Sequence, residues 1–129
     1  MGCEVMKKKV VFIAESLGGG VRRHLVDLLE NLNKDFYEIY VIYGSRTDSV
    51  FLEKMNILKR EGIVFCEVRS MVREISFKKD FNAFQEICQI LKQVKPDIVH
   101  CHSSKAGALG RICAKLLGIK QIYYTPHAY

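Results

Sequence analysis

The sequence predicts an α/β fold, a doubly wound parallel sheet of five strands with helices on both faces. Three observations predict it. Short apolar runs alternate with segments of helical spacing, no turn between them has a β-hairpin pattern, and the first run, "KVVFIA", is apolar on both faces. Strands that are joined through helices pair in parallel by right-handed crossovers, so the natural strand order is 3-2-1-4-5.

The first half of the chain is expected to form three strands and two helices. Continuous apolar or β-branched and aromatic runs predict the strands. Apolar residues at helical spacing predict the helices, which begin at glycine or a polar cap and stop at asparagine or glycine. The expected elements are a strand over 9–14, a helix from Gly20 to Asn33, a strand over 37–44, a helix from Asp48 or Ser49 to Gly62 and a strand over 63–68.

The second half repeats the alternation after an irregular segment. A proline and an aspartate predict the exit from one helix, and a serine cap and a closing glycine bound the next. The expected elements are irregular chain over 69–79, a helix from Asp80 to Val94 that Pro96 and Asp97 end, a strand over 97–102, a helix from Ser103 or Ser104 to Gly118, and a last strand in "QIYYTPHAY".

Length and composition predict one domain, residues 1–129, with room for one good core. The chain is 49% apolar and 26% charged. No apolar stretch is long enough for a membrane-spanning helix, and "MGCEVMKKK" is too short and polar for a secretory signal, so we expect a cytoplasmic protein. Five cysteines, an odd count with no Cys-x-x-Cys pair, fit a reducing compartment.

The net charge of +6 is spread over several short basic groups. These groups lack the interleaved aromatics of a single-stranded nucleic-acid platform, so no nucleic-acid partner is expected. We expect most of these charged side chains to be on the solvated surface. The alternative is that the basic surface lies against anionic lipid or takes anionic ligands.

In the order 3-2-1-4-5, ligands bind where the first and fourth strands end side by side. Three unusual segments follow strands there: the glycine turn over 16–20, "HCHSSKAG" over 100–107, and "TPHAY" at the chain end. Their convergence on one crevice is more informative than any of them alone.

Gly18, Gly19 and Gly20 give a backbone that can lie close to a ligand, and the amides of the following helix suit a phosphate. Neither the dinucleotide fingerprint nor the P-loop is met, because the third glycine and a Gly-Lys-Ser/Thr are lacking. A tight turn without a ligand is the alternative. Three consecutive glycines exceed what a turn needs, which favours anion binding.

His100 and His102 share one side of a strand, which raises the question of zinc. No third ligand is nearby, so we expect no metal, with His100 packed within the sheet and His102 at its exposed end. Ser103, Ser104 and Lys105 can offer hydroxyl, amide and ammonium donors at a helix start. The small residues that follow, Ala106, Gly107, Ala108 and Gly110, let this helix lie close to its neighbours.

His127 follows Thr125 and Pro126, where the last strand leaves the sheet. A histidine there can be ordinary polar surface. Its coincidence with the glycine turn in one crevice favours a ligand role.

Three stretches together resemble the N-terminal domain of the family 4 glycosyltransferases, retaining enzymes of GT-B architecture that build bacterial capsular and other polysaccharides. They are "ESLGGGVRRHLVDLL", "VREISFKKDFNAF" and "KPDIVHCHSSKAGALGRICAKLLGIKQIYYTPHAY", and the last, over 96–129, is the most specific. The resemblance implies a Rossmann-like half that receives the acceptor. A C-terminal half, absent from these residues, binds a nucleotide-diphosphate sugar, often UDP-linked, without an essential metal or other cofactor.

The resemblance also implies residue roles. Gly18, Gly19 and Gly20 approach the donor diphosphate, and His127 contacts the donor sugar as the catalytic candidate. Ser103, Ser104 and Lys105 face a saccharide or lipid-linked acceptor, with Arg73 a further candidate. Because the basic pair and the paired glutamates of the C-terminal half have no counterpart here, the isolated chain is expected to be inactive.

Two other hypotheses for the function remain. The chain can be a stand-alone subunit that binds the acceptor or docks at the inner face of the membrane and completes its site with a partner chain. It can also be a nucleotide-binding module without transfer chemistry.

Overall fold

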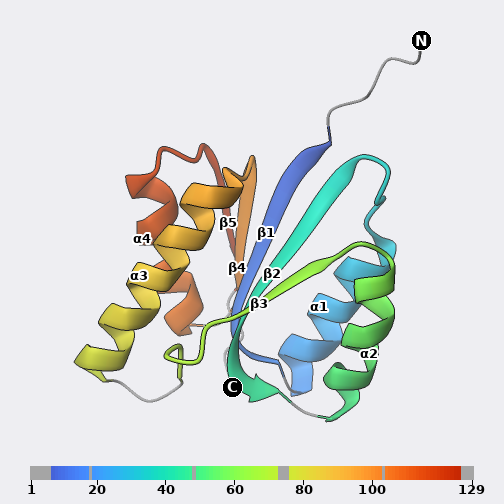
Figure 1. Ribbon diagram of the computed structural model, residues 1–129, viewed down its shortest axis with the longest axis horizontal. Helices are drawn as coiled ribbons and strands as arrows, with labels where there is room; N and C mark the ends of the chain where they lie inside the picture. The colour runs from blue at the N-terminus through green and yellow to red at the C-terminus, as the bar shows by residue number, and fades with distance from the viewer. Residues whose placement is uncertain (1–6, 18, 48, 73–75, 103, 126–129) are drawn as a thin grey trace.

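The computed structural model is a single five-stranded parallel sheet between two helical layers (Figure 1). It describes residues 7–17, 19–47, 49–72, 76–102 and 104–125. The elements are β1 (Lys8–Leu17), α1 (Gly19–Asn31), β2 (Tyr37–Thr47), α2 (Ser49–Arg60), β3 (Val64–Glu67), α3 (Phe77–Val94), β4 (Ile98–His102), α4 (Ser104–Leu116) and β5 (Gln121–Thr125).

The strand order is β3-β2-β1-β4-β5, and every pairing is parallel. The predicted order is therefore confirmed. The helices α1 and α2 cover one face, and α3 and α4 cover the other (Figure 1). Each layer has its own apolar core, because successive side chains of the buried central strand β1 point to opposite faces: Phe12 packs in one core and Ile13 in the other.

The helix α3 begins three residues before the predicted start at Asp80. Ser76 is its N-cap, and the Ser76 side chain accepts a hydrogen bond from the Lys79 N–H. Asp80 accepts a hydrogen bond from the Ser76 N–H at 3.3 Å, so this residue, the predicted helix start, belongs to the capping arrangement inside the first turn.

Small residues let α4 lie against the sheet, as predicted. A Cβ added at Gly110 would be 2.6 Å from the Cys101 Sγ and 2.9 Å from the Ile13 Cδ1. Ala106, Gly107 and Gly110 are buried, whereas Ala108 is exposed. This close approach brings the start of α4 to the end of β1.

A register shift between β1 and β2 follows Ala14, where Ala14 pairs with Tyr43 and Ser16 pairs with Arg46. The extra residue is on β2, beside Gly44. A Cβ at Gly44 would overlap the carbonyl oxygens of Glu15 and Met71. The bulge thus allows the last residues of β1 to lie against the β2 backbone at the edge where the site forms.

Candidate functional site

Three strands end side by side at the carboxyl edge of the sheet, the lower edge in Figure 1. Ala14 of β1 pairs with His102 of β4, and His102 pairs with Thr125 of β5. The helix α1 begins at Gly19 and α4 at Ser104, each two residues after its strand ends. The predicted meeting of the carboxyl ends of β1, β4 and β5 is therefore confirmed.

One hydrogen bond joins two of these turns directly. The Lys105 backbone N–H donates to the Glu15 Oε1 at 2.8 Å, although the two residues lie 90 positions apart. The side chain of Glu15 is only 7% exposed. The first amides of a helix have no partner within the helix and carry a partial positive charge, so a buried carboxylate is well placed there.

The other end of Lys105 is also occupied. Its Nζ forms an ion pair with the Asp80 Oδ1 of α3 at 2.7 Å, and the two side chains are 11% and 24% exposed. Lys105 thus links β1, α3 and α4. The ammonium group that was predicted to face an acceptor is turned toward Asp80, which gives Lys105 a positioning role. Its predicted contact with an acceptor stays a prediction.

The two histidines of β4 lie on the same face, with ring centroids 4.3 Å apart, as their spacing predicts. The expectation that His102 is exposed is wrong, because it is fully buried. Its ring lies between His24 of α1, at 5.5 Å, and Phe12 of β1, at 6.1 Å. The helix α1 covers the end of β4, which a single strand pattern cannot reveal.

His100 is partly buried, as predicted. Its Nε2 is hydrogen-bonded to the Thr125 Oγ1 at 2.7 Å. This bond fixes the last described residue of β5 against β4. The end of β5 therefore lies beside the end of β4.

Several predicted site residues lie outside the described residues: Gly18, Arg73, Ser103 and His127. Gly19 and Gly20 form the start of α1, and Ser104 is the first residue of α4. Their placement at the carboxyl edge agrees with the expectation. Their contacts with a donor or an acceptor stay predictions.

Sequence reasoning missed Glu15, Asp80, His24 and Thr125. A signal existed for Glu15, since it is the first charged residue after a continuous apolar strand. Ser76 followed by Asp80 also resembles a helix start. Nothing local marks His24 or Thr125, because their roles come from strands and helices that are distant in sequence.

Within the described ranges, no three His, Cys, Asp or Glu side chains are gathered as metal ligands would be. The expectation that no metal is needed stays a prediction. In the same part of the chain, no helix is both long and apolar enough to span a bilayer.

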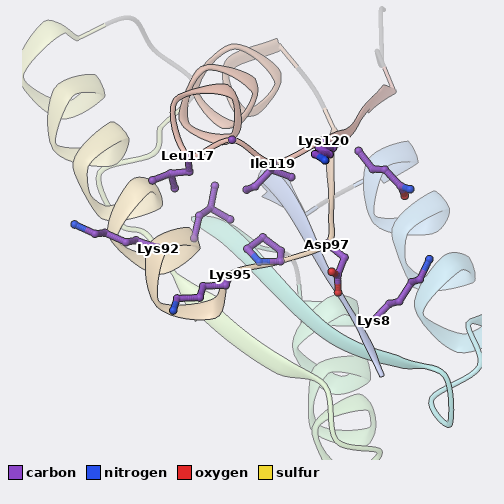
Figure 2. Close-up of a pocket in the computed structure, with 11 residues that line it drawn as sticks. Lys8, Lys92, Lys95, Asp97, Leu117, Ile119 and Lys120 are labelled. Carbon is purple, nitrogen blue, oxygen red and sulfur yellow. The ribbon is translucent and has the colours of Figure 1, made fainter. Parts of the chain in front are cut away.

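A cavity of about 580 Å3 lies at the opposite, amino edge of the sheet, between the last turns of α3 and α4 (Figure 2). Leu117, Ile119 and Pro96 line its floor, and Lys8, Lys92, Lys95 and Lys120 surround it. Lys92 and Lys95 lie in the last turn and at the C-cap of α3, where cations balance the partial negative charge of the helix carbonyls. The cavity lies at the edge opposite to the carboxyl-edge site, and the end of α3 accounts for Lys92 and Lys95.

The model of the family described as Glycosyltransferase Family 4 matches residues 18–129. The chain belongs to this family. The matched region contains every part of the carboxyl edge that follows β1. The candidate site at this edge therefore lies within the family 4 domain.

Two relatives are similar to this family 4 domain. An Escherichia coli protein named UDP-Gal:alpha-D-GlcNAc-diphosphoundecaprenol alpha-1,3-galactosyltransferase is 44% identical over 62 residues, which are 48% of this chain and 16% of that protein. A Klebsiella pneumoniae protein, an uncharacterized 41.2 kDa protein in the cps region, is 29% identical over 93% of this chain and 31% of its own length. This family 4 domain therefore spans less than a third of either relative.

Solved structures show the same fold at low sequence identity. Acinetobacter baumannii MurG has a TM-score of 0.64 at 21% identity, covering 92% of this chain and 34% of MurG. The lipopolysaccharide outer core galactosyltransferase WaaB has 0.62 at 23%, covering 92% and 33%. A putative UDP-N-acetylglucosamine 2-epimerase from Listeria monocytogenes has 0.63 at 17%, covering 93% and 31%. The fold alone therefore does not separate glycosyl transfer from epimerisation.

We expect Glu15→Leu to lower the free energy of unfolding by about 2 kcal/mol, because it leaves the partly buried Lys105 N–H without the Glu15 acceptor. Glu15→Gln keeps an amide oxygen in the same place and should recover at least half of that loss. Urea unfolding followed by circular dichroism measures both. Equal losses for the two variants would contradict an acceptor role for the Glu15 side chain.

Proposed function

We propose that this family 4 domain is the acceptor-side half of a glycosyltransferase. The enzyme transfers a sugar from a nucleotide-diphosphate sugar to a lipid-linked or saccharide acceptor in cell-envelope or capsular polysaccharide synthesis. The observation that carries the proposal is the Glu15–Lys105 hydrogen bond, because it joins the end of β1, beside the glycine turn, to the start of α4. Family membership and the name of the Escherichia coli relative support the chemistry and suggest UDP-galactose as the first donor to test.

The charges at the two helix starts favour the donor diphosphate at α1. The first turn of α1 has no acidic residue and contains Gly19, Gly20 and Arg22. The start of α4, in contrast, already has the Glu15 carboxylate against it. A leaving diphosphate needs preorganised positive charge and amide dipoles, so it fits α1 better than α4.

On this proposal the acceptor lies over the β4–α4 turn, near Ser103 and Ser104, with Arg73 at its margin. His127 contacts the donor sugar from the segment after Thr125. Transfer retains the anomeric configuration and needs no essential metal. The resemblance to family 4 enzymes is the basis for these roles.

The activity requires a second half that binds the nucleotide. This chain spans 16% and 31% of its two relatives, so the longer proteins have room for another domain. We propose that the nucleotide half follows in the same polypeptide or comes from a partner chain. The protein works in the cytoplasm, at the inner face of the membrane when its acceptor is lipid-linked.

In the enzyme that contains both halves, Gly20→Val and His127→Ala should each lower transfer by roughly a hundredfold or more while the fold is kept. The glycine variant blocks backbone approach to the diphosphate, and the histidine variant removes a contact with the donor sugar. The assay is transfer of labelled galactose from UDP-galactose to a lipid-linked acceptor. The control is Asn82→Ala on the exposed surface of α3, and unchanged turnover in either site variant would count against that residue's role.

The isolated chain should bind UDP only weakly, with a Kd above roughly 1 mM, because most of the nucleotide contacts belong to the other half. Isothermal titration calorimetry measures this Kd. Micromolar binding by these 129 residues alone would instead favour a nucleotide-binding module without transfer chemistry.

An exposed aromatic pair on α3 supports contact with the membrane. Phe77 and Phe81 are 88% and 60% exposed and lie one helical turn apart, with exposed Lys78 and Lys79 next to them. Asp80, between them, contacts Lys105, so the pair lies close to the proposed acceptor side. Aromatic side chains with neighbouring lysines bind an anionic bilayer surface.

Replacing both Phe77 and Phe81 by alanine should lower partition onto vesicles of anionic phospholipid by about tenfold or more, because two apolar side chains no longer enter the interface. Vesicle co-sedimentation measures the partition. Phe36→Ala is the matched control, since Phe36 is also exposed but lies at the amino end of β2. Equal losses in the control and the double variant would refute a docking role for this pair.

A further inference from the structure

Two thiols of different helices lie in direct contact in the layer formed by α3 and α4. The Cys88 Sγ and the Cys113 Sγ are 2.6 Å apart, and both cysteines are free. This separation is little more than the length of a disulfide bond, about 2.0 Å, so only a small movement would be needed to join the two sulfur atoms. The Cys88 S–H donates to the Cys113 Sγ, and the Cys113 S–H donates to the Phe84 carbonyl oxygen at 3.5 Å.

The contact belongs to a regular seam between the two helices. Cys88 lies eight residues after Asp80 on α3, and Cys113 lies eight residues after Lys105 on α4. Asp80 and Lys105 form the ion pair of the site. The two helices therefore run in the same direction and in register, and their packing, rather than a mobile loop, holds the two sulfur atoms together.

We propose that Cys88 and Cys113 are a modification site at which a hydroperoxide forms a disulfide between α3 and α4. The sulfur of Cys88, which is partly exposed, attacks hydrogen peroxide, the O–O bond breaks, and one water leaves. The Cys113 sulfur then attacks the sulfenic acid at Cys88, the S–O bond breaks, and a second water leaves. Two thiols lose two electrons and two protons, and one peroxide is reduced to two waters.

The other thiols of the described residues are less suited to this reaction. Burial raises the pKa of Cys101 to about 12, so its thiolate is scarce near neutral pH. Burial also raises the pKa of Cys113, which makes it a poor first nucleophile. Cys113 still reacts in the second step, because its contact with the oxidised Cys88 makes that step intramolecular. Cys66 lies on strand β3 and not on the seam between α3 and α4.

The disulfide would tie the seam two turns away from Asp80 and Lys105. It closes a loop of 25 residues, the separation of Cys88 and Cys113. Such a cross-link restricts the unfolded chain, so the oxidised protein should have a Tm higher by roughly 10 °C. The rise should be lost when dithiothreitol reduces the bond.

The test treats the folded protein with a small excess of hydrogen peroxide, blocks the remaining thiols and maps the peptides without reduction. We expect one linked peptide that joins Cys88 to Cys113, an intact mass lower by two hydrogen atoms, and the higher Tm. Cys88→Ser should lose the linked peptide and the rise in Tm. Cys66→Ser, which changes another half-buried cysteine, should keep both.

The proposal is overturned if the folded protein gives no 88–113 peptide while Cys88 is oxidised to sulfinic acid, or if Cys88 pairs with a different cysteine. Should Cys88→Ser fail to fold, the peptide map and dithiothreitol reversal of the unsubstituted protein decide the question. The result does not depend on glycosyl transfer, because no step of the assay uses a sugar donor.

Discussion

The buried carboxylate of Glu15 against the start of α4 is the contact on which the geometry of the carboxyl edge depends. A carboxylate that is only 7% exposed would destabilise the fold without a hydrogen-bond donor beside it. The Lys105 N–H supplies the donor, and the Asp80 carboxylate neutralises the Lys105 ammonium. One residue of α4 thus connects β1 with α3.

The same contacts give the two helices at this edge different electrostatic properties. The start of α4 is compensated by a side chain of the protein itself, whereas the first turn of α1 combines glycine with arginine and contains no acid. A parallel sheet places both helix starts on one edge. An anionic group that enters there meets one helix start that a carboxylate already compensates and one whose first turn has no acidic residue. This asymmetry supports the proposal that the donor diphosphate lies at the glycine turn and the acceptor at the β4–α4 turn.

Sequence reasoning predicted most of the architecture, because periodicity and turn residues report on local structure. The strand order and the common face of His100 and His102 both followed from it. It misplaced the start of α3, since the cap at Ser76 lies in a segment without apolar periodicity. It did not predict the ion pair of Lys105 with Asp80, because the two residues lie on different helices and no local pattern relates them.

The sequence by itself determined the alternation of strands and helices, the two buried faces of β1 and the small residues that let α4 approach the sheet. Each of these is encoded by residues a few positions apart, through side-chain spacing and steric size. Only the tertiary structure decided that Glu15 meets Lys105, that α1 buries His102, and that Cys88 touches Cys113. These contacts join residues 15 and 105, 24 and 102, and 88 and 113, and such distant pairs are set by how helices pack on the sheet, which no local pattern records.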